Sequence, residues 1–363
     1  MSFWEEKPKK EHFVVQNPVP YQPPVPEPTA EPQVEVLFTG DLKLASKQFS
    51  RMGLGVFLIY VVALVVQLVA TLVLRLVNPG LLENEWIFWL LTTLPLYAVG
   101  IPVGLAVMLP KPKAECSYEK MTFGRFICLM LIAWAMMYAG ALVGNIINSI
   151  FTAATGVEVG DEVAELALST SILPKLLFMV VIGPIMEELV FRKALIDRMR
   201  IYGEKTAVVV SALLFGLFHG NLAQLFYAFT LGLLFGYVYL RTGKLRYSAM
   251  LHVFINFMGS VASTFVVNNV DTDAVLSAME EGADPELLVQ LVPQMAIAAI
   301  YNLVVIAMLV AGVVLFFVRK RNVHFDRAPM QLPYGTLGKT VFLNLGMILL
   351  LLGCAVLIVL SLV

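Results

Sequence analysis

The chain has 363 residues, of which 59% are hydrophobic and 14% are charged, with a formal net charge of −1. Soluble domains carry about 25% charged and about 45–50% apolar residues, so the composition excludes an ordinary soluble protein. The near-neutral charge also gives no reason to expect a nucleic acid partner. Because the apolar residues come in long blocks, we predict an all-α fold, a polytopic transmembrane helical bundle embedded in a lipid bilayer.

Residues 1–50 differ from the rest of the chain. The stretch NPVPYQPPVPEPTAEPQ is rich in proline and polar residues. Such a composition favours extended or disordered chain and cannot bury a core. We therefore predict that residues 1–50 form a disordered cytoplasmic tail.

The apolar segments that follow predict about eight or nine membrane spans, since a helix needs roughly 20 apolar residues to cross a bilayer. These segments are 53–77, 86–109, 124–151, 173–195, 206–220, 221–240, 247–267, 293–318 and 340–362. Segment 206–220 is short and meets segment 221–240 almost without a loop. These two segments predict a tight helical hairpin whose turn is shielded by protein.

Three pairs of glycines at GxxxG spacing are typical of closely packed membrane helices. The alternative is chance, because membrane helices tolerate glycine. The pairs are Gly100/Gly104, Gly140/Gly144 and Gly232/Gly236.

The loops between the predicted spans alternate in charge, and cytoplasmic loops favour Lys and Arg. Basic residues lie in 43–51, 111–125, 192–205, 241–246 and 319–327, whereas acidic residues lie in 83–85, 158–165 and 271–286. This asymmetry predicts a multi-pass protein, with the plasma membrane as its expected location and the N-terminus in the cytoplasm.

Within the predicted membrane segments, ionisable and polar side chains gather in three short motifs. They are Glu187, Glu188 and Arg192 in GPIMEELVFRKAL, Phe215 and His219 in FGLFH, and His252 and Asn256 in HVFIN. Ionisable groups at membrane depth are rare and usually face a cavity, a pathway or one another.

Helical spacing separates the roles of the two carboxylates. Glu188 and Arg192 are four residues apart and share a face, so they predict an ion pair. Glu187 lies about 100° around the helix and is the carboxylate free for chemistry. Each motif also has a structural interpretation, since an ion pair can be architectural and polar pairs commonly join membrane helices.

The ordered motifs EExxxR, FxxxH and HxxxN resemble the CPBP family, the Abi/CAAX-protease superfamily of intramembrane endopeptidases that includes the type II CAAX prenyl endopeptidase. The resemblance covers roughly residues 170–265. On this basis we divide the chain into N-terminal transmembrane helices (51–165), a catalytic core (166–268), an acidic extracytoplasmic loop (269–292) and C-terminal transmembrane helices (293–363).

The resemblance implies hydrolysis of peptide bonds in membrane-embedded or membrane-anchored proteins or peptides. Glu187 would act as general base, His219 would hold the water or pass the proton, and His252 and Asn256 would stabilise the oxyanion. Glu188 and Arg192 would order the site from a supporting position.

The sequence leaves the cofactor and the class of function open. No cofactor is favoured, but zinc is an alternative in which His219, His252 and a carboxylate would be ligands. A proton-coupled transporter would also use intramembrane carboxylates and histidines. A non-catalytic membrane scaffold or immunity protein that kept the site residues is the third interpretation.

Overall fold

The computed structural model describes residues 41–109, 118–157, 159–160, 162–278 and 285–362. These residues form helices joined by short connections, with no strand among them. The predicted fold class, an all-α membrane helical bundle, is confirmed. Most of the predicted disordered tail lies outside the described residues, and so does part of the predicted acidic loop.

The N-terminal part of the bundle contains three long helical stretches. Helix α1 begins before the predicted boundary at residue 50, because Asp41 caps it by accepting a hydrogen bond from the Lys43 backbone N–H. The helices are α1 (Leu42–Val77), η1 (Pro79–Glu83), α2 (Glu85–Leu94), η2 (Pro95–Gly100), α3 (Ile101–Met108), α4 (Phe123–Thr155) and α5 (Glu162–Ser169).

The central part holds the three polar motifs. One helical run extends from Ile172 to Tyr202, and two antiparallel helices and a further run follow it. Its elements are α6 (Ile172–Pro174), η3 (Lys175–Ile182), α7 (Gly183–Glu188), η4 (Leu189–Ile196), α8 (Asp197–Met199), η5 (Arg200–Tyr202), α9 (Glu204–Phe218), α10 (Leu222–Thr242), α11 (Leu245–Asn256), η6 (Phe257–Ala262) and α12 (Ser263–Asn269).

The C-terminal part places helix α13 inside the predicted acidic loop, so that segment is partly helical rather than a plain loop. The elements are α13 (Thr272–Ala278), α14 (Pro285–Arg319), η7 (Lys320–Asn322), α15 (Leu337–Phe342) and α16 (Leu345–Leu360).

Six helical stretches of the described chain are long and apolar enough to cross a membrane, fewer than the eight or nine spans predicted. They are Leu42–Val77, Glu85–Met108, Phe123–Thr155, Leu222–Thr242, Leu245–Asn269 and Glu286–Asn322. The other three predicted spans are also helical. The run 172–202 is rich in charged residues, while α9 has 15 residues and α16 has 16.

Helices α9 and α10 form the predicted tight hairpin. Gly220 makes the turn with a φ of 67°, a left-handed conformation that glycine adopts without strain. Asn221 then starts α10 by accepting a hydrogen bond of 2.8 Å from the Gln224 N–H. At Gly216 an added Cβ would lie 2.7 Å from the Leu225 carbonyl oxygen, so glycine is needed for the close approach of the two helices.

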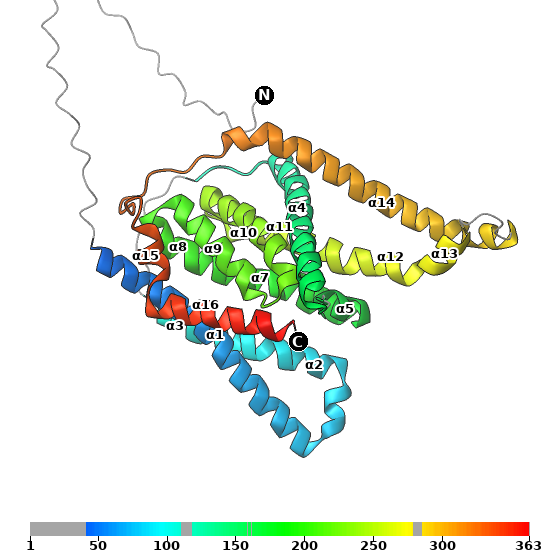
Figure 1. Cartoon of the computed structure of the whole chain (residues 1–363), viewed down its shortest axis with the longest axis horizontal. Coiled ribbons are helices and arrows are strands. Elements are labelled where there is room, and N and C mark those ends of the chain that lie inside the picture. Colours follow the sequence, from blue (N-terminus) through cyan, green and yellow to red (C-terminus); the bar gives the residue numbers. More distant parts are fainter. Residues whose placement is uncertain (1–40, 110–117, 158, 161, 279–284, 363) are drawn as a thin grey trace, which may run out of the picture.

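The central helices α7 to α11 lie between two groups of neighbours (Figure 1). Helices α1, α3 and α16 pack together on one side, and α4 packs against α10 and α14 on the other. This arrangement encloses the helices that carry the three polar motifs.

Candidate active site

The two adjacent carboxylates occupy a short α-helical segment between two π-helical ones. Helix α7 ends at Glu188, with η3 before it and η4 after it, and both flanking segments are π-helical. Asn256 is likewise followed directly by the π-helical segment η6. Because π-turns occur frequently at functional sites, the backbone around two of the three motifs fits a site rather than plain membrane anchoring.

Glu188 and Arg192 form the predicted ion pair. The Glu188 Oε1 and Arg192 Nη2 atoms are 3.1 Å apart, and neither side chain has exposed surface. The guanidinium carbon of Arg192 lies 4.5 Å from the centre of the Phe215 ring, a cation–π distance. No guanidinium nitrogen forms a hydrogen bond with a described residue. The arginine is therefore held by charge and ring contacts alone.

His252 lies between the two carboxylates. Its Nδ1 is 3.3 Å from the Glu188 Oε1, and its Nε2 is 3.7 Å from the Glu187 Oε2. A carboxylate only accepts, so Nδ1 carries the proton in this contact. The second distance is too long for a hydrogen bond. His252 is thus fixed by Glu188 and presents its other nitrogen towards Glu187.

Glu187 differs from Glu188 in exposure. The Glu187 side chain is 22% exposed, whereas that of Glu188 is completely buried. Among the described residues, Glu187 forms no ion pair with a lysine or an arginine, and its one close partner of this kind is the His252 ring. Glu187 is therefore the carboxylate that a water or a substrate can reach.

His219 joins the site through Phe215. It caps the end of α9, and its Nδ1 lies 2.8 Å from the Phe215 carbonyl oxygen. A carbonyl only accepts, so Nδ1 is protonated and Nε2 is the free acceptor of a neutral ring. The Phe215 ring lies edge-on to His219 at 5.0 Å and to His252 at 5.5 Å. His219 is also within electrostatic range of Glu187 and His252.

Asn256 takes a different partner from the one expected for an oxyanion donor. Its Nδ2 donates a 2.9 Å hydrogen bond to the Met179 carbonyl oxygen in η3. A side-chain amide has two N–H groups, so one is left for another acceptor. Asn256 therefore connects α11 to the helix of the two carboxylates.

The zinc alternative requires three converging ligands. Among the described residues, no group of three or more His, Cys, Asp or Glu side chains is arranged to hold a metal ion. The nitrogens of His252 face the two carboxylates, and Nδ1 of His219 faces a carbonyl. The described side chains therefore do not fit a zinc site.

Two tyrosines absent from the sequence-based site also lie beside the helices that carry the motifs. Tyr60 on α1 packs against Phe218 at the end of α9, and Tyr97 in η2 lies against α7. The Tyr60 hydroxyl is buried without a hydrogen bond to any described residue. Tyr97 lies over Gly183, one helical turn before Glu187, where an added Cβ would be 3.3 Å from its hydroxyl.

The sequence holds a weak signal for these tyrosines. Tyrosine in membrane helices is enriched at the two interfaces, whereas Tyr60 and Tyr97 lie in the middle of their helical stretches, Leu42–Val77 and Glu85–Met108. The hydroxyl of a mid-span tyrosine is far from water and needs a hydrogen-bond partner within the protein. Only the packing shows that Tyr60 lies on Phe218 and that the Tyr97 hydroxyl lies over Gly183.

The fold and the site together define a multi-pass helical membrane protein with a buried Glu–Arg–His cluster. Residues 169–258 match the family model described as type II CAAX prenyl endopeptidase Rce1-like. This match confirms the resemblance to the CPBP/CAAX protease family, and it includes all seven residues of the three motifs from Glu187 to Asn256. The chain matches no curated protein and no solved structure at a significant level.

Proposed function

We propose that this protein is an intramembrane endopeptidase that hydrolyses peptide bonds in membrane-embedded or membrane-anchored proteins or peptides. The family match supports a CAAX-type intramembrane protease in general. The observation that carries the proposal is the unequal environment of the adjacent carboxylates. Glu188 is buried against Arg192, while Glu187 is partly exposed and faces His252.

Glu187 is the general base of the proposed reaction. Its carboxylate takes a proton from a water molecule, and the hydroxide oxygen bonds to the carbonyl carbon of the peptide as that carbonyl becomes an oxyanion. The C–N bond then breaks as the amine leaves with the proton held by Glu187. General acid–base catalysis of this kind contributes typically 10²–10⁴-fold in rate.

The histidines and the asparagine assist at defined atoms. Nε2 of His219 accepts a hydrogen bond from the attacking water, because its Nδ1 is committed to the Phe215 carbonyl. The second N–H of Asn256 and a protonated Nε2 of His252 are the donors for the oxyanion. Glu188 and Arg192 are positioning residues, since Glu188 orients His252 and Arg192 balances the charge of Glu188.

Tyr60 adds a hydroxyl from outside the matched segment. Its ring packs against Phe218, the neighbour of His219, with ring centres 4.2 Å apart. The buried hydroxyl has no hydrogen-bond partner among the described residues. In the proposed reaction it donates a hydrogen bond to the Glu187 carboxylate or to the water that Glu187 activates.

The test compares new protein termini in membranes from cells that carry the native protein or Glu187→Gln at matched expression. Glutamine keeps the size of the side chain and removes the base. Glu165→Gln is the matched control, because Glu165 is exposed and distant in sequence from the three motifs. We expect a set of termini that is present with the native protein and the control and absent with Glu187→Gln. Identical profiles from all three well-folded proteins would reject the protease and favour a transporter or a scaffold.

A further inference from the structure

A second concave site lies on the opposite face of α10 from His252. It is a cavity of about 270 Å³, and Leu233, Leu234 and Tyr237 of α10 line it. The neighbouring Phe235 instead contacts His252, with ring centres 5.2 Å apart. Helix α10 therefore separates the cavity from the candidate active site.

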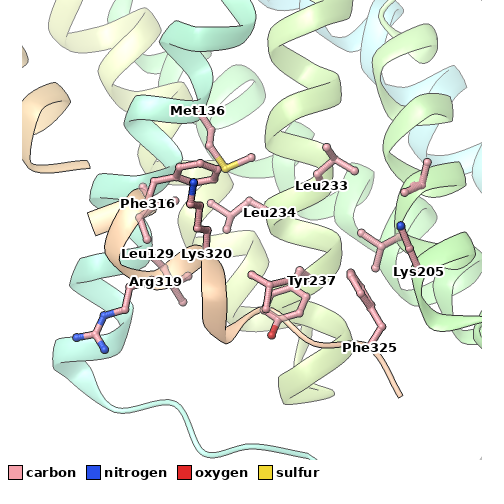
Figure 2. Close-up of a pocket in the computed structure, with 14 residues that line it drawn as sticks. Leu129, Met136, Lys205, Leu233, Leu234, Tyr237, Phe316, Arg319, Lys320 and Phe325 are labelled. Carbon is pink, nitrogen blue, oxygen red and sulfur yellow. The ribbon is translucent and has the colours of Figure 1, made fainter. Parts of the chain in front are cut away.

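The walls of this cavity are apolar, and its cations come from two different helices (Figure 2). The rest of the apolar lining comes from α4, α9, α14 and the segment after η7: Leu129, Ile132, Met136, Val208, Val209, Phe316, Val323 and Phe325. Lys205 comes from the start of α9, whereas Arg319 is the last residue of α14 and Lys320 the first of η7. In Figure 2 the Arg319 guanidinium points away from the cavity.

The two lysines are not neutralised within the described part of the chain. Lys205 and Lys320 are both exposed, and neither forms an ion pair with another described residue. The nearest carboxylate in sequence, Glu204, is engaged by Arg200 and Arg241. Lys320 lies 4.5 Å from the centre of the Phe317 ring. Lys205 and Lys320 thus place positive charge at the rim of the cavity without a counter-ion among the described residues.

The cavity lies at the basic end of the bundle. It lies at the end of the bundle where α4 and α9 begin and where α10 and α14 end. The basic residues there are those that predict the cytoplasmic side. Basic pockets between membrane helices on that side are suited to anionic lipid headgroups.

We propose that this cavity binds one acyl chain of an anionic phospholipid whose phosphate is attracted by Lys205 and Lys320. The volume is near the lower end of the range for ligand pockets, about 300–1,000 Å³, so it suits one chain segment rather than a whole lipid. The apolar walls receive the chain and the lysines select the headgroup.

Native mass spectrometry of the purified full-length protein in a non-ionic detergent tests the proposal. The probes are phosphatidylglycerol and phosphatidylcholine with identical acyl chains. We expect one phosphatidylglycerol to be retained in preference to phosphatidylcholine. Lys205→Gln/Lys320→Gln should weaken its binding by roughly fivefold for each lysine, since a Lys near the surface contributes about 1 kcal/mol.

The matched control is Lys43→Gln/Lys47→Gln, which removes two exposed lysines at the start of α1 on the same predicted side. This control variant should keep the preference for phosphatidylglycerol over phosphatidylcholine. A second pair of variants tests the apolar wall: Val209→Trp fills the cavity and should reduce retention of both lipids, whereas Val69→Trp on α1 should not. Thermal unfolding confirms that every variant is folded.

Several outcomes would overturn the proposal. Equal binding of the two lipids would show that the site does not select the headgroup. Equal binding of phosphatidylglycerol by the lysine variant and the native protein would show that the two lysines do not select it. Displacement of the lipid by glycerol phosphate would show a site for a soluble anion. Displacement by a lipid-modified peptide without an anionic headgroup would show a substrate-anchor site instead.

Discussion

The Glu188 carboxylate lies 3.1 Å from the Arg192 guanidinium, and both side chains are completely buried. A buried ion pair adds little stability relative to an apolar pair, but removal of one partner leaves an uncompensated charge. This relationship makes Arg192 a structural requirement for the site, even though it need not touch a substrate.

Arg192→Met should therefore lower the free energy of unfolding by about 3–5 kcal/mol. Glu188→Gln/Arg192→Met should recover much of that loss, because neither buried charge remains. Unfolding in detergent followed by circular dichroism measures both variants. If the double variant is as unstable as the sum of the single ones, the two residues are not coupled.

Comparison of Glu187→Gln with Glu188→Gln should show which carboxylate is needed for cleavage alone and which is also needed for stability. Glu187→Gln should reduce cleavage by at least about 100-fold, in line with loss of a general base, and should leave the melting temperature unchanged because Glu187 is partly exposed. Glu188→Gln should lower both the cleavage rate and the melting temperature, because it removes the partner of Arg192 and of His252. The two readouts are turnover of an identified substrate and the melting temperature. If Glu188→Gln abolished cleavage without changing the melting temperature, and Glu187→Gln lowered the melting temperature, Glu188 would be the base.

Tyr60→Phe should reduce turnover by roughly 10- to 100-fold, because a hydrogen bond to a charged group contributes about 1.5–3 kcal/mol. The ring contact with Phe218 is retained in this variant, so stability should not change. Tyr301→Phe on α14 is the control. Turnover by Tyr60→Phe equal to that of the native protein would exclude the hydroxyl from the reaction.

Gly140→Ala should destabilise the contact between α4 and α10, whereas Gly144→Ala should be tolerated. An added Cβ at Gly140 would lie 2.5 Å from the Tyr227 Cα atom, but at Gly144 the nearest atom would be 3.6 Å away. Overpacking of this kind costs typically 1–3 kcal/mol. Melting temperatures of the two variants check the difference, and equal values would show that α4 can shift.

The predicted orientation can be tested with single cysteines in a chain whose native cysteines are replaced by serine. We expect Asn84→Cys to react with a membrane-impermeant maleimide on intact cells. Lys43→Cys should react only after permeabilisation, because the basic flanks predict a cytoplasmic N-terminus. Reversed labelling would invert the topology, and with it the side on which the lipid cavity opens.

The number of membrane spans could be predicted only in part from the sequence. Apolar blocks identified every long helix, but only six stretches meet the length and composition of a membrane span. The run 172–202 is helical although it is interrupted by charges, because most of these side chains have partners. Glu188 pairs with Arg192 and Lys193 with Asp197 inside the run, whereas Arg198 and Arg200 bond to neighbouring helices. Hydropathy measures single segments and contains no information about those partners.

Local spacing by itself determined the helical class, the hairpin of α9 and α10, and the pairing of Glu188 with Arg192. Each depends on residues close together in the chain, where helical geometry sets the distances. Only the tertiary structure decided that His252 lies between two carboxylates that are more than 60 residues away, that Asn256 bonds to Met179, and that Tyr60 packs against Phe218 beside His219. These contacts depend on which faces of separate helices pack together, and the periodicity of one helix cannot specify the face of another.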